Sequence, residues 1–72
     1  MTELDTVVLT RDVPEAGLKA GDMGTVVFEH ADGGVEVEFV TGGGRTVALL
    51  KLAEGDVRPL GDGELLHARP VR

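Results

Sequence analysis

The chain has 72 residues, with thirteen carboxylate side chains against seven lysines and arginines, and a formal net charge of −6 at pH 7. A chain of this length holds one domain with one hydrophobic core. It contains no cysteine, which excludes disulfides, thiolate metal sites and catalytic thiols and suits a reducing cytoplasm. We find no signal-peptide pattern at its start and no apolar run approaching the roughly 18 residues of a membrane span. We therefore expect a soluble, cytoplasmic protein without membrane contact.

The acidic balance also argues against nucleic acid as a partner. Nucleic-acid binders draw much of their affinity from lysine and arginine on phosphates, and single-strand binders need exposed aromatic rings. Phe28 and Phe39 are the only aromatic residues, and both lie in apolar strand patterns. We expect no appreciable affinity for DNA or RNA. An acidic surface suits solubility, cation binding or docking onto a basic protein.

The first predicted strand covers residues 6–10, because β-branched residues dominate and Val7 and Leu9 share one face. Residues 11–17 are predicted as the start of a long loop, since Pro14 removes a ladder donor.

Residues 17–28 form a corner that leads from this loop into a second predicted strand, residues 25–30. Gly21 and Asp22 form a turn dipeptide, and Gly24 permits a tight or positive-φ backbone directly before the strand. Such corners recur in small SH3-like barrels.

Two hairpins follow. The Asp-Gly pair within residues 31–34 is a strong turn signal between two apolar runs. Residues 35–40 then alternate cleanly, with Glu36 and Glu38 toward water. Three consecutive glycines in residues 41–45 predict a second, mobile turn.

The next predicted strand, residues 46–52, is apolar on both faces. If Lys51 points to solvent, Val47 and Leu49 lie on its side, while the other apolar residues face inward. A bulge would reverse part of that assignment. Residues 53–56 are predicted as a tight or single helical turn before a short last strand, residues 57–60, at the sheet edge.

We expect residues 1–60 to form the domain and residues 61–72 to form a C-terminal extension that is partly ordered or flexible. Residues 64–69 have the pattern of one marginal helical turn or of a sixth strand. Such a tail is ordered only if Leu65 and Leu66 find apolar surface.

These elements predict an all-β fold, a small five-stranded SH3-like barrel with a short C-terminal extension. The alternating strand patterns place one set of residues in its interior: Val7, Leu9, Val26, Phe28, Val35, Val37, Phe39 and Leu50.

The order of these motifs resembles a family of small bacterial proteins known as domain of unknown function 4926. The similarity runs from residue 4 to residue 60 and rests on five segments: residues 4–10, 13–27, 36–40, 46–50 and 57–59. The resemblance implies the SH3-like five-stranded barrel. It brings no catalytic residues, ligand residues or cofactor to carry over.

Chemical motifs are sparse. Carboxylates gather in two stretches, residues 12–22 and 32–38, but the Asp-x-Asn/Asp-x-Asn/Asp-Gly loop of a calcium site is absent. His30 and His67 are too few for a zinc site without cysteine. The chain has no serine, cysteine or tyrosine, and a barrel this small encloses no cavity of enzyme size. We expect no enzymatic activity, no cofactor and no metal.

Val47 and Leu49 are the remaining candidates. Either the tail or a loop covers this apolar strip, or another protein or a second copy of the chain binds it. We therefore favour a non-enzymatic, acidic protein-interaction module, such as an antitoxin- or immunity-like partner of a more basic protein. The alternative is an SH3-like module that binds a metal cation or nucleic acid.

Overall fold

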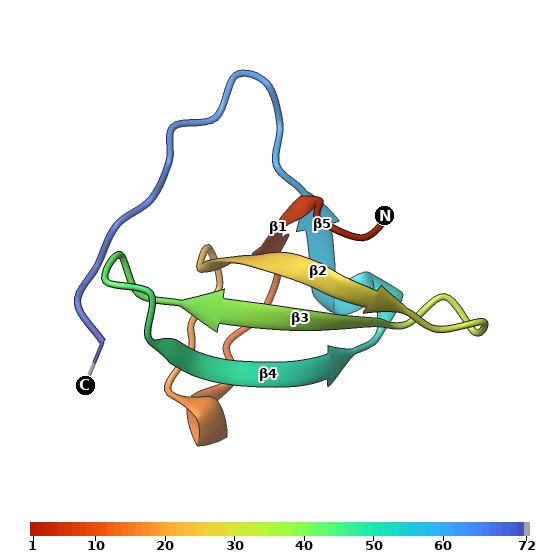
Figure 1. The fold of residues 1–72 in the computed structure, drawn as a ribbon. Helices are drawn as coiled ribbons and strands as arrows, with labels where there is room; N and C mark the ends of the chain where they lie inside the picture. The colour runs from red at the N-terminus through yellow and green to blue at the C-terminus, as the bar shows by residue number, and fades with distance from the viewer. Residues whose placement is uncertain (72) are drawn as a thin grey trace.

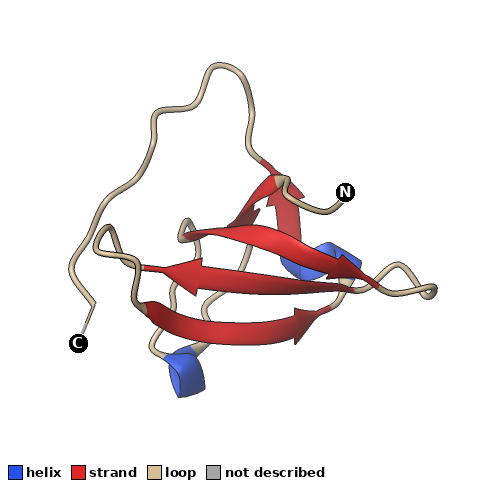
Figure 2. Cartoon of the chain, in the orientation of Figure 1, coloured by secondary structure: helices blue, strands red, loops and turns tan. Residues whose placement is uncertain are grey.

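The computed structural model describes residues 1–71, which form one five-stranded antiparallel sheet in the order β4-β3-β2-β1-β5 (Figure 1). Two single-turn 3₁₀ helices, η1 and η2, interrupt the connections (Figure 2). The strands and helices have these bounds: β1 Thr6–Leu9, η1 Pro14–Ala16, β2 Met23–Glu29, β3 Val35–Val40, β4 Thr46–Leu52, η2 Glu54–Asp56 and β5 Val57–Pro59. The all-β prediction is confirmed. Within the described residues no ladder joins β4 to β5, so hydrogen bonds do not close the sheet.

Strand β2 belongs to both halves of the sheet. Its first residues pair with β1, where Gly24 lies opposite Val7, and its later residues pair with β3. A Cβ at Gly24 would lie 2.5 Å from Val37 Cγ1 and 2.9 Å from Phe39 Cε2. Glycine is therefore required here for a close approach, because both neighbours belong to the buried core.

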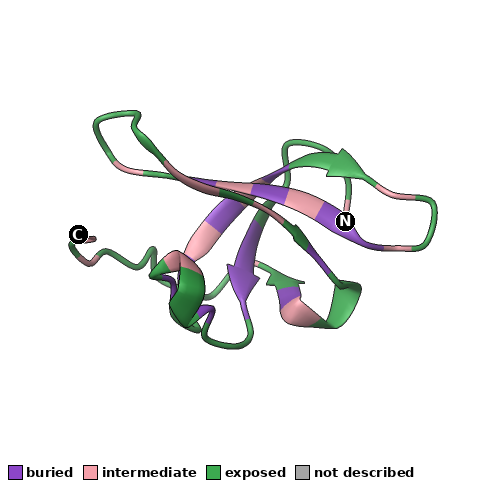
Figure 3. Ribbon diagram, turned by 90° about the horizontal axis from the view of Figure 1, so that it is seen from below, coloured by how far each residue is buried: buried purple, intermediate pink, exposed green. Residues whose placement is uncertain are grey.

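The core lies on the concave face of the bent sheet. Aliphatic side chains from all five strands meet there with two from the β1–β2 loop, and Phe39 is the core's aromatic residue. Buried and less buried residues alternate along β3 (Figure 3). The buried set is Val7, Leu9, Val13, Leu18, Val26, Val35, Val37, Phe39, Leu52 and Val57.

The prediction that Phe28 is buried is wrong. The register between β2 and β3 shifts between Val26 and Phe28, so Val27 is an extra residue and the alternation reverses after it. Phe28 consequently lies opposite Glu36 on the outer face and is 49 % exposed. Leu50 faces inward as predicted, but it is only partly buried because β4 is an edge strand.

Over its described residues, 60–71, the C-terminal tail contains neither the helical turn nor the sixth strand that the sequence suggested. It leaves β5 and runs around the sheet, and residues 70–71 lie beside the turn between β3 and β4 (Figure 1). Leu65 and Leu66 do not anchor it, since they are 92 % and 76 % exposed. Polar contacts hold the tail instead.

The two phenylalanines should respond very differently to truncation. Phe39→Ala removes the buried ring and should cost roughly 3–5 kcal/mol, enough to unfold most of a domain this small. Phe28→Ala should cost about 1 kcal/mol or less, because the ring stays half in water. Thermal and urea unfolding of both variants measure the difference, and equal losses would contradict the reversed register after Val27.

Gly24→Ala should destabilise the protein by about 1–3 kcal/mol, because the added methyl overlaps Val37 and Phe39. Gly42→Ala is the matched control, since a Cβ there meets nothing within 4 Å. Urea unfolding compares the two variants. A Gly24→Ala protein as stable as the control would show that β2 and β3 do not approach as described.

Candidate functional site

The outer face of strands β2, β3 and β4 carries exposed apolar side chains among carboxylates. Phe28 lies opposite Glu36, and Leu49, 56 % exposed, lies opposite Glu38. Val40 follows Glu38 on the same face of β3 and is also exposed. This outer face, Phe28, Val40 and Leu49 with their acidic neighbours, is one candidate surface.

Val47 does not share that face with Leu49. The register between β3 and β4 shifts between Phe39 and Val40, which makes Val47 the extra residue of a bulge. Its side chain packs against the core instead. The expectation of one strip formed by Val47 and Leu49 is therefore corrected, and Leu49 alone stays on the side of Lys51.

Strand β4 is also a free edge. It pairs with β3 alone, and within the described residues it makes no backbone hydrogen bond outside that ladder. It is seven residues long, and Lys51 is its single charged residue. An edge of this length presents unpaired N–H and C=O groups to another strand.

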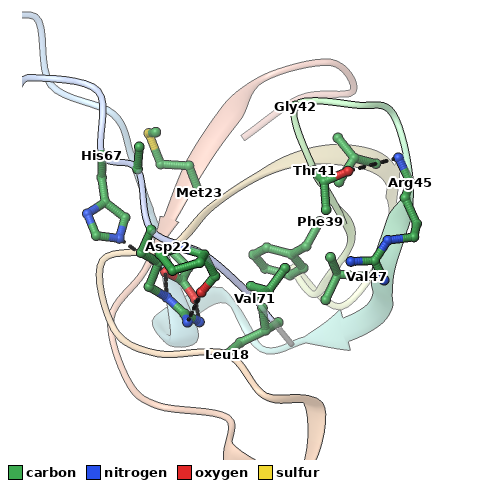
Figure 4. A pocket seen from close by; sticks show the side chains of 14 residues that line it. Leu18, Asp22, Met23, Phe39, Thr41, Gly42, Arg45, Val47, His67 and Val71 are labelled. Carbon is green, nitrogen blue, oxygen red and sulfur yellow. Dashed lines mark hydrogen bonds and ion pairs between the residues drawn. The ribbon is translucent and has the colours of Figure 1, made fainter.

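A groove of about 500 Å³ lies beside Val47 at the start of β4, on the side away from Leu49. The β3–β4 turn, the end of the β1–β2 loop and the tail surround it (Figure 4). Leu18, Phe39 and Val47 contribute apolar surface, and Val71 of the tail lies beside them. Asp22 and Arg69 stand at one end.

Asp22 is the buried charge of this region and is 7 % exposed. The Arg69 guanidinium forms a bidentate ion pair with the Asp22 carboxylate. Nε donates to Oδ1 at 2.8 Å and Nη2 donates to Oδ2 at 2.5 Å. The backbone N–H of Lys19 donates to Oδ2 at 2.9 Å, and His67 Nε2 lies 3.3 Å from Oδ1. Arg69, aided by Lys19 and His67, lowers the pKa of Asp22 although burial opposes that shift.

A second ion pair fastens the start of the tail. Both terminal nitrogens of Arg58 on β5 donate to the Glu64 carboxylate at 2.6 Å, and the N–H of Gly61 donates to the same group. Arg58 lowers the pKa of Glu64 to about 2. The tail is thus attached at two ionic points, with exposed Leu65 and Leu66 between them.

The sequence matches one known family, described as a domain of unknown function (DUF4926), over residues 3–59. The chain belongs to this family. No curated protein and no solved structure matches it. The matched region of this DUF4926 protein includes all five strands and Asp22, whereas Arg69 lies beyond it.

Several other carboxylates of the two acidic stretches cap turns or pair with neighbours. Asp12 accepts from the N–H of Ala20, and Asp32 accepts from that of Gly34. His30 Nε2 lies 2.8 Å from Glu36 Oε2. Within residues 1–71, no three His, Cys, Asp or Glu side chains converge as a metal site would need, and no helix is long and apolar enough to cross a membrane.

Sequence reasoning missed the Asp22–Arg69 pair. The sequence predicts a turn at Asp22 and offers Leu65 and Leu66 as the anchors of the tail, whereas the two partners of the ion pair are 47 residues apart. One signal in the sequence was available. The tail carries the basic side chains of His67 and Arg69, and it follows an acidic domain whose carboxylates could pair with them.

The tail should detach only in acid. A carboxylate with a lowered pKa stabilises the folded state above its ordinary pKa, 3.8 for Asp22, and loses this contribution as pH falls through the lower folded value. We expect the NMR signal of the Arg69 Nε–H and the methyl signals of Val71 to hold near neutral pH and to shift only below 3.8. Asp22→Asn should show the detached signals at every pH, and unchanged signals in that variant would contradict the anchor.

Proposed function

We propose that this DUF4926 protein is a non-enzymatic interaction module that binds an extended segment of a basic partner protein along the free edge of β4. The observation that carries the proposal is the seven-residue edge strand beside the apolar outer face. Adding a strand to an open edge is a recurrent mode of peptide recognition. Its main-chain hydrogen bonds supply affinity, and alternate side chains supply specificity.

The charge of the domain favours a basic partner. The formal net charge is −6, and Glu36 and Glu38 lie on the strand next to the edge, opposite Lys51 and Leu49. Complementary charge speeds encounter and disfavours acidic competitors. An antitoxin- or immunity-like protein that neutralises a more basic protein is one form that this function takes.

The same proposal includes an SH3-like barrel, left open between β4 and β5, and a bacterial cytoplasmic setting. Support comes from the family resemblance, from the strand order and from the absence of cysteine. The absence of serine, cysteine and tyrosine supports a role other than nucleophilic catalysis.

Leu49→Lys should weaken partner binding while leaving the fold intact, because Leu49 is exposed on the outer face. Leu65→Lys is the matched control, with the same change on an exposed leucine of the tail. Each protein serves as bait for a lysate of its native host, and a retained basic protein is then purified and titrated by calorimetry. We expect affinity to fall at least about tenfold for Leu49→Lys, roughly a hot-spot effect, and to persist for Leu65→Lys.

Hydrogen exchange supplies the second measurement. Amides of β4 that point away from β3 should exchange quickly in the free protein and become protected by the partner. Equal binding by wild type and Leu49→Lys, or no new protection in β4, would contradict the proposal. A melting temperature that rises with calcium, or salt-sensitive binding of an oligonucleotide, would favour the cation or nucleic-acid alternative instead.

A further inference from the structure

We propose that the surface ending at Asp22, where residues 67–71 now form one wall of the groove, is a binding site for an extended, arginine-bearing segment of a basic partner protein, and that the tail stands in for that segment. This site centres on Asp22 and not on the free edge of β4, although Val40 of the outer face and Val47 of β4 also line the groove. The tail shows which chemistry the groove accepts: a guanidinium at one end and an apolar side chain at the other.

The carboxylate and its cation come from different parts of the chain. Asp22 and Gly17, which both contact Arg69, lie inside residues 3–59, the region matched by the family. Arg69 lies ten residues beyond the end of that region, in a tail without regular structure. The family domain thus contains the receptor, and the arginine is supplied from outside it.

The receptor is positioned without help from the tail. The carbonyl of Asp22 accepts from the N–H of Leu9 at 2.9 Å, and its own N–H donates to the carbonyl of Lys19 at 3.0 Å. The N–H of Lys19 also holds one carboxylate oxygen. A carboxylate fixed at both backbone and side chain matches the planar, two-pronged guanidinium better than it matches a lysine ammonium.

Two further contacts define the segment that fits. Arg69 Nη2 also donates to the carbonyl of Gly17 at 2.9 Å, where the chain turns through a left-handed φ of 73°. Two residues later, Val71 lines the groove beside Leu18 and Phe39 (Figure 4). Pro70 restricts the backbone between them. The groove therefore favours arginine followed, two positions on, by an apolar residue in an extended chain.

Side-chain contacts, rather than backbone–backbone hydrogen bonds, hold the end of the tail. No backbone–backbone hydrogen bond involves residues 65–71, and Leu65 and Leu66 are exposed. A second copy of this chain carries the same charge of −6, which opposes exchange of tails between copies. A basic segment gains from that field, and it is the occupant that the charges favour.

Peptide binding to the full-length chain tests the site. The probe is a synthetic peptide with the sequence of residues 65–71, titrated into wild type and into Arg69→Ala, whose own tail no longer fills the Asp22 end. A short tether holds the tail at about millimolar effective concentration. For a peptide Kd of about 0.1 mM, Arg69→Ala should therefore bind about tenfold more tightly than wild type.

Arg58→Ala is the matched control, because it removes an arginine that pairs with Glu64 on β5 and does not line the groove. In this variant the tail should still compete with the peptide for the groove, so the peptide should bind it with the same affinity as it binds wild type. A peptide with lysine or glutamine in place of arginine should lose binding to Arg69→Ala, which tests the role of the Asp22 carboxylate without a second substitution in the protein. Adding Asp22→Asn to Arg69→Ala should abolish binding, with thermal melting as the folding check.

Three results would overturn the proposal. The first is an absence of peptide binding to Arg69→Ala, and the second is an affinity that does not depend on the peptide's arginine. The third is a wild-type protein that sediments as a dimer and becomes monomeric in Arg69→Ala, because the groove would then serve a second copy of the chain.

Discussion

The close approach of β2 to β3 at Gly24 is the constraint on which the rest of this small sheet depends. Strand β2 pairs with β1 through its first residues and with β3 through its last, so it must bend around the core between the two ladders. Val37 and Phe39 fill the space that a side chain at Gly24 would need. The bend brings the loop before β2 over the same core, and Asp22 is fixed two residues before Gly24 by its bonds to Leu9 and Lys19. The packing of the core and the position of the buried carboxylate therefore have one geometric origin.

Local patterns predicted the strands well and their faces less well. Residues 35–40 alternate without interruption, and their ladder follows that alternation, so Val35, Val37 and Phe39 are buried as expected. The faces predicted for Phe28 and Val47 are wrong because of two bulges, each of which adds one residue to its strand. Phe28 follows the bulge in β2, and Val47 is itself the extra residue in β4. A bulge leaves almost no trace in hydrophobic periodicity, since an apolar residue on either side of it fits both registers.

The tail was misjudged for a different reason. Leu65 and Leu66 are the large apolar residues within the predicted helical turn, and burial of apolar surface is the usual way to order a terminal segment. Here the ordering contacts are Arg58 with Glu64 and Asp22 with Arg69. Pairing between charges far apart in sequence carries no periodic signal, and seven basic against thirteen acidic residues allow many combinations. The chemistry of the groove could be recognised only once the fold had placed both ends of the pair together.

One bulge in β4 keeps the two proposed surfaces apart. It turns Val47 onto the core and into the groove with Phe39, while Leu49, two residues later, stays on the outer face opposite Glu38. A regular strand would have placed both residues on one face and left the groove without its Val47 wall. Because the bulge lies at the first residues of β4, the strand pairs with β3 without a further shift from Ala48 to Leu52, which leaves a continuous edge on its other side. The same seven residues thus supply a wall for an arginine-bearing segment on one side and an open edge with an exposed leucine on the other. Substitutions at Val47 and at Leu49 consequently affect different surfaces, because Val47 lines the groove and Leu49 is exposed on the outer face.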